Sequence, residues 1–189
     1  MVDLLFKLRR IIRILNFKLK GQLLKLFFIS CGCKVGERLI CKKWPIFRTY
    51  PNRNIIIGDD VIIGYFITFD VITPGTLRIG DRVELSHNII LGSLSQIAIG
   101  NDCLIGENVS IRDDDHQFNK DIRINAQGWE VKSVSIEDDV WIGAHSLILS
   151  GAKVSRGAVI GANSVVLDKS NIQSYCIYAG SPVRLIGKR

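Results

Sequence analysis

From Ile57 onward, aliphatic residues recur every six positions, and most of them are followed by glycine. The segments IGDDVI, IGYFIT, IGDRVE, IGNDCL and IGENVS show the pattern, with a small or β-branched residue at the fifth position. An amphipathic helix would need apolar residues three and four positions apart, and a half-buried strand would alternate. A six-residue period instead predicts very short strands separated by tight bends, with positions one and five pointing inward. Such hexads must stack in coils, because one alone cannot bury its apolar side chains.

The first positions of the hexads fall into groups of three, which predicts a triangular coil for each group. The step within a group is six, and every extra residue follows the third member, in steps of ten, eight and twenty-five. All insertions are therefore expected at one corner of a prism of six coils, about 29 Å tall. The groups are Ile57, Ile63 and Phe69; Ile79, Leu85 and Leu91; Ile99, Ile105 and Ile111; Ile136, Ile142 and Ile148; Val154, Ile160 and Val166; and a weaker first group, Val35, Cys41 and Phe47.

Residues 1–30 follow a different pattern, in which apolar and basic residues interleave at helical spacing. This predicts an amphipathic helix, with seven basic residues and one acidic residue, Asp3, in positions 1–29. No run of about eighteen residues is free of charge, which argues against a transmembrane span, and the charges run through the apolar region, unlike those of a signal peptide. Two interpretations stay open: residues 1–29 lie on an anionic membrane surface, or they pack within an oligomer.

The charge and the cysteine content narrow the partners and the compartment. The net charge of +7 suits a polyanionic partner, but nucleic acid is disfavoured because the basic excess sits on a lipophilic helix without an aromatic stacking platform. The five cysteines are an odd number without disulfide-framework spacing, so a cytoplasmic location is expected. The expected organisation is a helix over 1–30, a repeat domain over 31–172 with a loop at 112–135, and a tail over 173–189.

The hexads, the WIG segment at 141–143 and the tail AGSPVRLI at 179–186 resemble the hexapeptide-repeat acyltransferases, particularly the galactoside, maltose and streptogramin O-acetyltransferase branch. The resemblance covers roughly residues 55–189. It implies an all-β fold, a left-handed parallel β-helix, with the predicted N-terminal α-helix added to it. It also implies a homotrimer with active sites between neighbouring prisms, a coenzyme A thioester donor such as acetyl-CoA, and a sugar or glycan acceptor.

The longest insertion, 112–135, carries the most polar cluster of the repeat body. Such a long loop in a compact repeat is uncommon unless it has a function. His116 is its only side chain whose ordinary pKa suits proton transfer at neutral pH. In the family a histidine on such a loop removes the proton of the acceptor hydroxyl, so the resemblance implies that His116 is the catalytic base. A surface histidine without a role is the alternative.

Four residues are candidates for contact with the acceptor. Asp113 and Asp115, with Asp114 between them, could orient the imidazole or hydrogen-bond sugar hydroxyls, or could cap the backbone of the loop. Asn88 resembles an acceptor-contacting asparagine of the sugar O-acetyltransferases. Trp129 could stack on a sugar ring or anchor the loop to the prism.

The resemblance also implies a path for coenzyme A along the later coils. Basic tail residues are candidates for its phosphates, and small residues would let the pantetheine approach the backbone, although coil packing alone requires such residues as well. The candidate cofactor-binding residues are Trp141, Gly143, Ala144, Gly161, Ala162, Lys169 and Arg184.

Other functions of a repeat prism fit less well. A zinc enzyme would need three converging histidines, and the spacing of His87, His116 and His145 does not suggest a metal site. A non-catalytic scaffold would leave the histidine loop and the tail unexplained. The predicted function is therefore transfer of an acetyl group from acetyl-CoA to a hydroxyl of a sugar or glycan precursor, in cell-surface polysaccharide biosynthesis. N-acetylation of an amino sugar is the alternative.

Overall fold

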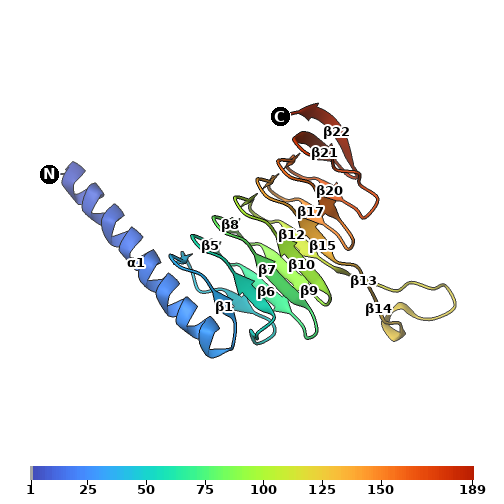
Figure 1. Cartoon of the computed structure of the whole chain (residues 1–189), viewed down its shortest axis with the longest axis horizontal. Helices are drawn as coiled ribbons and strands as arrows, with labels where there is room; N and C mark the ends of the chain where they lie inside the picture. The colour runs from blue at the N-terminus through green and yellow to red at the C-terminus, as the bar shows by residue number, and fades with distance from the viewer. Residues whose placement is uncertain (1) are drawn as a thin grey trace.

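A computed structural model shows one long helix followed by a solenoid of short parallel strands (Figure 1). The structure describes residues 2–189, so Met1 of the expected N-terminal segment lies outside the described residues. The helix, α1, spans Val2–Ser30. The strands then wind into three faces, and residues far apart in sequence become neighbours in successive coils. The expected left-handed parallel β-helix with an N-terminal helix is confirmed.

The three faces consist of strands that recur every third position along the chain. The first face contains β1 (Lys34–Val35), β4 (Ile55–Ile57), β7 (Thr76–Ile79), β10 (Gln96–Ile99), β15 (Val134–Ile136) and β18 (Lys153–Val154). The second contains β2 (Ile40–Cys41), β5 (Ile62–Tyr65), β8 (Glu84–His87), β11 (Leu104–Ile105), β16 (Trp141–Ile142), β19 (Val159–Ile160), β21 (Cys176–Gly180) and β22 (Val183–Lys188). The third contains β3 (Ile46–Phe47), β6 (Thr68–Val71), β9 (Ile90–Ser93), β12 (Ser110–Arg112), β17 (Leu147–Ile148) and β20 (Val165–Val166).

The strand register confirms the grouping of the hexads into coils. On the first face Ile57 pairs with Ile79, Ile79 with Ile99, and Ile99 with Ile136. The weaker first group is a coil as well, because Val35 pairs with Ile57. All these isoleucines are almost completely buried, so positions one of successive hexads form the inner columns of the prism.

A seventh level extends the second face beyond the six coils that the repeat predicts. Ile172 and Tyr178 continue the six-residue step after Val166, and both are buried. Tyr178 of β21 pairs with Ile160, and β22 folds back antiparallel to β21. The tail thus closes the C-terminal end of the core. Its first positions have no apolar third member, because position 184 is Arg184, so counting in groups of three does not reveal this level.

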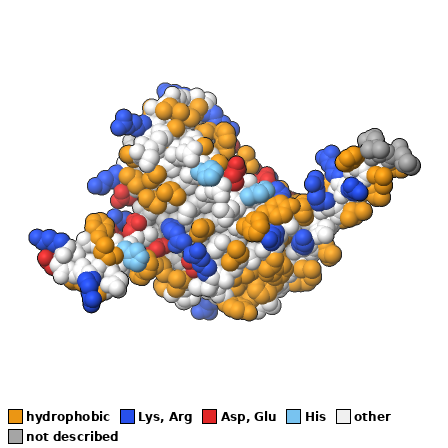
Figure 2. All heavy atoms as spheres, turned by 180° about the vertical axis from the view of Figure 1, so that it is seen from behind, with side chains coloured by type: hydrophobic (Ala, Val, Ile, Leu, Met, Phe, Trp, Pro, Cys, Tyr) orange, Lys and Arg blue, Asp and Glu red, His pale blue; other side chains and the backbone are white. Residues whose placement is uncertain are grey.

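Helix α1 runs across the end of the solenoid that begins with β1, and its N-terminal half extends beyond it (Figures 1 and 2). Leu24 and Phe28 are fully buried beneath it, and the Phe28 ring meets Phe69 edge-on at 5.8 Å between ring centroids. Lys25 Nζ lies 2.8 Å from Glu37 Oε1. The helix therefore caps the open end of the core. In the described part of the chain no helix combines the length and apolar character that a membrane span requires.

Replacement of Gly21 by alanine is expected to destabilise the fold by about 1–3 kcal/mol and to lower Tm by roughly 3–10 °C. Alanine ordinarily favours a helix over glycine, but here its Cβ would lie 1.8 Å from the carbonyl oxygen of Leu39. Thermal unfolding followed by circular dichroism measures the effect. Gly128→Ala is the matched control, because its Cβ would meet nothing closer than Gln117 Oε1 at 3.6 Å. Equal Tm values for the two variants would contradict this close approach.

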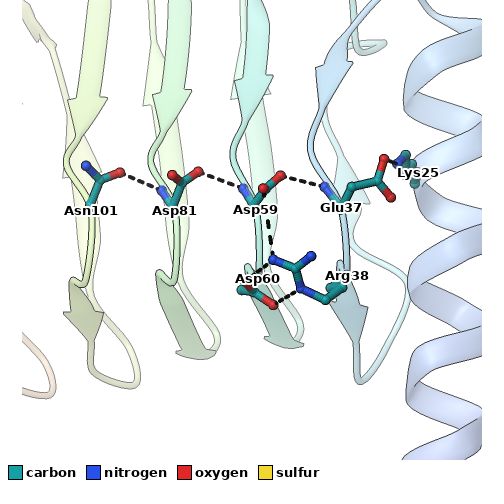
Figure 3. A network of polar contacts seen from close by, with 7 residues as sticks. All are labelled: Lys25, Glu37, Arg38, Asp59, Asp60, Asp81 and Asn101. Carbon is teal, nitrogen blue, oxygen red and sulfur yellow. Dashed lines mark hydrogen bonds and ion pairs between the residues drawn. The ribbon is translucent and has the colours of Figure 1, made fainter.

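A ladder of carboxylate and amide oxygens holds the corner between the first and second faces (Figure 3). Asp59 Oδ1 accepts a hydrogen bond from the Glu37 N–H, and Asp81 Oδ1 accepts one from the Asp59 N–H. Asn101 Oδ1 accepts a hydrogen bond from the Asp81 N–H. Gly58 precedes this position because a Cβ there would lie 2.3 Å from Asp81 Oδ1. The recurring IGD and IGN motifs therefore belong to the framework and not to the active site.

Candidate active site

The longest insertion forms a hairpin that leaves the prism at the corner between the third and first faces (Figure 1). Its strands are β13 (Asp114–His116) and β14 (Trp129–Val131), which pair antiparallel, and a 3-10 turn, η1 (Ile124–Ala126), lies between them. His116 and Trp129 are opposite each other in this register, with ring centroids 3.9 Å apart. The expected loop is thus an ordered arm that carries the candidate base beside an aromatic ring.

Asp113 fixes the base of this arm. Its side chain is completely buried and accepts three hydrogen bonds, from the Leu94 N–H at 2.7 Å, the Ser95 N–H at 2.9 Å and the Ser93 hydroxyl at 2.8 Å. Its carbonyl oxygen accepts two more, from the Lys132 N–H and the Ser150 hydroxyl. Asp113 therefore caps backbone amides, and its carboxylate could contact an acceptor only by breaking these bonds.

His116 lies in a cleft of about 510 Å³ between the arm and the prism. The arm supplies one wall and the loops after β17 and β20 supply the other. Within residues 2–189 neither ring nitrogen of His116 has a hydrogen-bond partner, so no aspartate of the DDD run orients the imidazole. Either ring nitrogen can therefore accept a proton from an incoming hydroxyl. The lining residues are Asp115, His116, Phe118, Glu130, Lys132, Leu149, Ser150, Leu167, Asp168 and Lys169.

Asp114 is a partly buried carboxyl at the start of the arm. Desolvation raises the pKa of its carboxyl above the ordinary value, and the nearby Arg112 guanidinium only partly opposes this. Arg112 Nη1 lies 3.9 Å from Asp114 Oδ1, at the outer limit of an ion pair. The like charges of Asp113, Asp115 and Asp70 raise the pKa further. The folded state therefore holds a proton on Asp114 more readily than the unfolded chain does.

The variant Asp114→Asn is expected to have a higher Tm than the wild type at neutral pH. Because the pKa is raised in the folded state, stability falls as pH rises from the ordinary aspartate pKa, about 3.9, through the folded value. The amide abolishes this loss, so the two Tm curves should converge only below about pH 4. Thermal unfolding across pH tests this, with the exposed Asp115→Asn as control. Parallel curves for wild type and variant would refute it.

The other acceptor candidates do not all join His116. Asp115 lines the same cleft, and the Trp129 ring packs against the imidazole at an interplanar angle of 32°, with half of its surface exposed. Asn88 lies at the corner between the second and third faces, where its Nδ2 donates to Asn108 Oδ1 at 2.7 Å. Within one chain, the structure therefore brings Asp115 and Trp129 to His116 and leaves Asn88 at another corner.

The candidate coenzyme A residues group on the second face and its corner with the third. Trp141 is half exposed on β16. Gly143 and Gly161 stack in successive coils so closely that a Cβ on Gly143 would lie 2.6 Å from the Ala162 nitrogen. Ala144 lies next to Gly106 in the same column, since a Cβ on Gly106 would lie 2.7 Å from the backbone nitrogen of Ala144. These small residues are required by coil packing, whatever else they contact.

The two basic candidates, Arg184 and Lys169, lie in different parts of the fold. Arg184 lies on β22, where it pairs with Ala179 of β21. A Cβ on Gly161 would lie 3.0 Å from Ala179 Cβ, so Arg184 is close to the other candidates on the second face. Lys169 lines the cleft of His116 instead.

Apart from Lys169 and Asp113, sequence reasoning missed the far wall of the cleft and the anchors of the arm. Ser93, Asp113, Ser150 and Asp168 each lie two positions after the third member of their group. Coil counting places these four residues in one column, at the corner from which the arm departs. This alignment was the available signal, since each residue alone is an ordinary polar loop residue.

The three histidines do not converge. His87 packs against the Tyr65 ring at 5.0 Å between centroids, and His145 Nε2 lies 3.2 Å from Asn108 Nδ2. Among residues 2–189, no group of three or more His, Cys, Asp or Glu side chains is arranged to hold a metal ion.

Comparison with known proteins agrees with the repeat fold. The family model described as bacterial transferase hexapeptide (six repeats) matches residues 133–168. WbbJ of Escherichia coli (strain K12), named as a lipopolysaccharide biosynthesis O-acetyl transferase, is 29% identical over 72% of this chain and 73% of its own length. A Lysinibacillus sphaericus protein named as a macrolide acetyltransferase is 32% identical over 58% of this chain and 67% of its own. This protein belongs to the hexapeptide-repeat acyltransferases.

Solved structures of such acyltransferases share the fold. The Bacillus cereus N-acyltransferase AntD, in complex with dTDP and 3-hydroxybutyryl-CoA, covers 90% of this chain and 88% of its own, with a TM-score of 0.65 and 23% identity. The Vibrio cholerae hexapeptide-repeat acetyltransferase VCA0836, complexed with acetyl-CoA, covers 69% of this chain and 71% of its own, with a TM-score of 0.58 and 28% identity. Both of these neighbours are complexed with a coenzyme A thioester, and the present chain shares their fold. Among the curated relatives, it spans from 38% to 73% of their length.

Proposed function

We propose that this protein transfers the acetyl group of acetyl-CoA to a hydroxyl group of a sugar or glycan precursor, with His116 as the general base. The observation that carries the proposal is the position of His116, on an anchored arm, in a cleft, with both ring nitrogens unpartnered within residues 2–189. An imidazole titrates near neutral pH and can therefore both take and return a proton during turnover.

In the proposed mechanism the imidazole of His116 removes the proton of the acceptor hydroxyl as its oxygen attacks the thioester carbonyl. Backbone N–H groups can stabilise the negative charge of the resulting tetrahedral intermediate. The intermediate then collapses, the C–S bond breaks, and the imidazolium returns the proton to the departing thiolate of coenzyme A. The products are the acetyl ester and free coenzyme A, and no acyl-enzyme is formed. Asp115 and Trp129 would hold the acceptor beside His116.

The active form is proposed to be a homotrimer in which one chain supplies His116 and its neighbour the second-face residues. Within one chain, Trp141, Gly161 and Arg184 lie on or beside the second face, whereas the arm leaves from the corner between the third and first faces. Packing the arm of one copy near the second face of another would unite the two halves. Analytical ultracentrifugation tests this assembly, and a monomer with full activity would contradict it.

The biological acceptor is proposed to be a lipid-linked precursor of a cell-surface polysaccharide on the inner face of the cytoplasmic membrane. WbbJ, named for lipopolysaccharide biosynthesis, supports the substrate class. Helix α1 supports the membrane contact, because residues 4–15 expose apolar and basic side chains together.

Release of free thiol from acetyl-CoA across a panel of acceptors tests the reaction. The panel contains neutral sugars, amino sugars and lipid-linked glycans. We expect turnover with a hydroxyl acceptor and an O-acetyl product that mild alkali removes. An alkali-stable N-acetyl product would instead establish the amino-sugar alternative, and no acceptor-dependent thiol release would reject the acetyl-transfer proposal.

A further inference from the structure

Helix α1 presents an apolar stripe along its whole length on the side opposite the prism. The stripe residues follow steps of three or four, which places them on one face of a helix. All are exposed, with 48–71% of their surface accessible. Leu24 and Phe28, on the other side, are fully buried against the prism. The stripe consists of Leu4, Leu8, Ile11, Leu15, Leu19, Leu23, Leu26 and Ile29.

The stripe is continuous across two halves of α1 that differ in their surroundings. Residues 4–15 extend beyond the prism, whereas residues 19–29 lie on its end, with their outer face still uncovered (Figures 1 and 2). A helix that served only as a tether would need apolar residues in the extending half alone. The continuation over Leu19 and Leu26 implies that whatever covers the stripe also lies against the end of the prism.

The charges around the stripe select its partner. Residues 1–29 contain seven basic residues and one acidic residue, so a second copy of the helix would bring like charges together. An anionic lipid surface complements them, and the apolar face of such a helix enters a bilayer to a depth of roughly 5–10 Å. The basic residues are Lys7, Arg9, Arg10, Arg13, Lys18, Lys20 and Lys25.

We propose that the full length of α1 lies flat on an anionic bilayer, so that the prism stands upright with its first coil nearest the lipid. This inference rests on the membrane contact in the proposed function and specifies its geometry. His116 leaves the fourth coil, counted from β3 through β6 and β9 to β12. With coils about 4.8 Å apart, the fourth coil stands about 14 Å beyond the first. A helix about 10 Å thick that enters the bilayer by roughly 5–10 Å adds at most about 5 Å, so the reaction centre stands roughly 15–20 Å from the lipid surface.

This distance defines the acceptor more closely. A hydroxyl on the lipid headgroup, or on a sugar attached directly to it, would not reach a base held roughly 15–20 Å away. The acceptor is therefore an oligosaccharide chain on a lipid, modified at a sugar away from the anchor.

Flotation with vesicles tests the docking. The probes are phosphatidylcholine vesicles with and without phosphatidylglycerol, and the proteins are the wild type and two double variants, Leu8→Gln with Leu15→Gln and Leu19→Gln with Leu26→Gln. We expect the wild type to float with anionic vesicles and each double variant to bind about tenfold more weakly or worse. The control, Ile122→Gln with Ile124→Gln, removes exposed apolar residues of the arm and should bind as the wild type does.

The outcomes distinguish the upright docking of α1 from the proposed membrane contact and acetyl transfer. A wild type that stays unbound would reject membrane contact altogether, while leaving the acetyl-transfer assay untouched. Wild-type binding that only the Leu8 and Leu15 changes weaken would keep the contact and overturn the upright orientation. If the Leu19 and Leu26 changes alter the oligomeric state and not flotation, the stripe is an interface between copies and the inference is wrong. Circular dichroism verifies that each variant is folded.

The acceptor length has its own test, with the terminal sugar that the thiol-release panel identifies. We expect at least tenfold faster acetylation when that sugar ends a lipid-linked oligosaccharide than when it is attached directly to lipid in the same vesicles. Equal rates for the two would overturn the distance argument.

Discussion

The variant His116→Ala is expected to lower kcat for thiol release by about a hundredfold to ten-thousandfold, with little change in Tm. The imidazole is the group that would take the acceptor proton, and no other histidine lies in its cleft. Its side chain is exposed and touches the Trp129 ring, so its removal leaves the core of the prism unchanged. Steady-state thiol release with a responsive acceptor measures the effect.

The control for this experiment is His87→Ala. His87 is exposed on the second face, and its ring contact is with Tyr65, so its loss should leave turnover close to that of the wild type. A His116→Ala protein that keeps full turnover with the same acceptor would show that His116 is not the base.

The variant Asp113→Ala is expected to lose about 3 kcal/mol or more of stability, which lowers Tm by roughly 10 °C. The substitution removes a buried acceptor from the Leu94 and Ser95 amides and from the Ser93 hydroxyl. Each donor left unsatisfied costs about 1–3 kcal/mol. Activity should fall too, because the arm that carries His116 begins at this residue.

Thermal unfolding and hydrogen exchange test this prediction together. The Leu94, Ser95 and Lys132 amides, which bond to Asp113 in the wild type, should exchange faster in the variant. Asp115→Ala is the stability control, since that side chain is exposed and lies two residues away on the same arm. Equal Tm values for the two variants would show that Asp113 does not anchor the arm.

Much of the fold was predictable because the same short repeat determines the local conformation of every coil. Each hexad specifies one inward side chain and one bend, so counting positions gave the coils, the three faces and the register of Ile57, Ile79 and Ile99. The seventh level was not predicted because Ile172 and Tyr178 have no apolar third member, position 184 being an arginine. An incomplete coil can still bury its side chains, so the core extends beyond the last group of three.

The site was predictable only in part, because the contacts that define it join residues distant in sequence. The resemblance and the long insertion singled out His116 but could not choose among three adjacent aspartates. The structure distinguishes them by burial: Asp113 is completely buried, Asp114 keeps only 10% of its side chain exposed beside Arg112, and Asp115 lines the cleft. Side chains that alternate along a strand differ in environment although they share one chemistry.

By itself the sequence determined the stacked coils, the corner from which the arm departs, the amphipathic helix and the candidate base. These follow from periodicity and residue type, which act over a few neighbouring residues. Only the tertiary structure decided that α1 caps the prism with its apolar stripe outward, that Lys169 faces His116, and that the second-face residues lie at a different corner. Those results depend on how the coils turn in three dimensions, because burial and proximity belong to the folded chain and not to any single hexad.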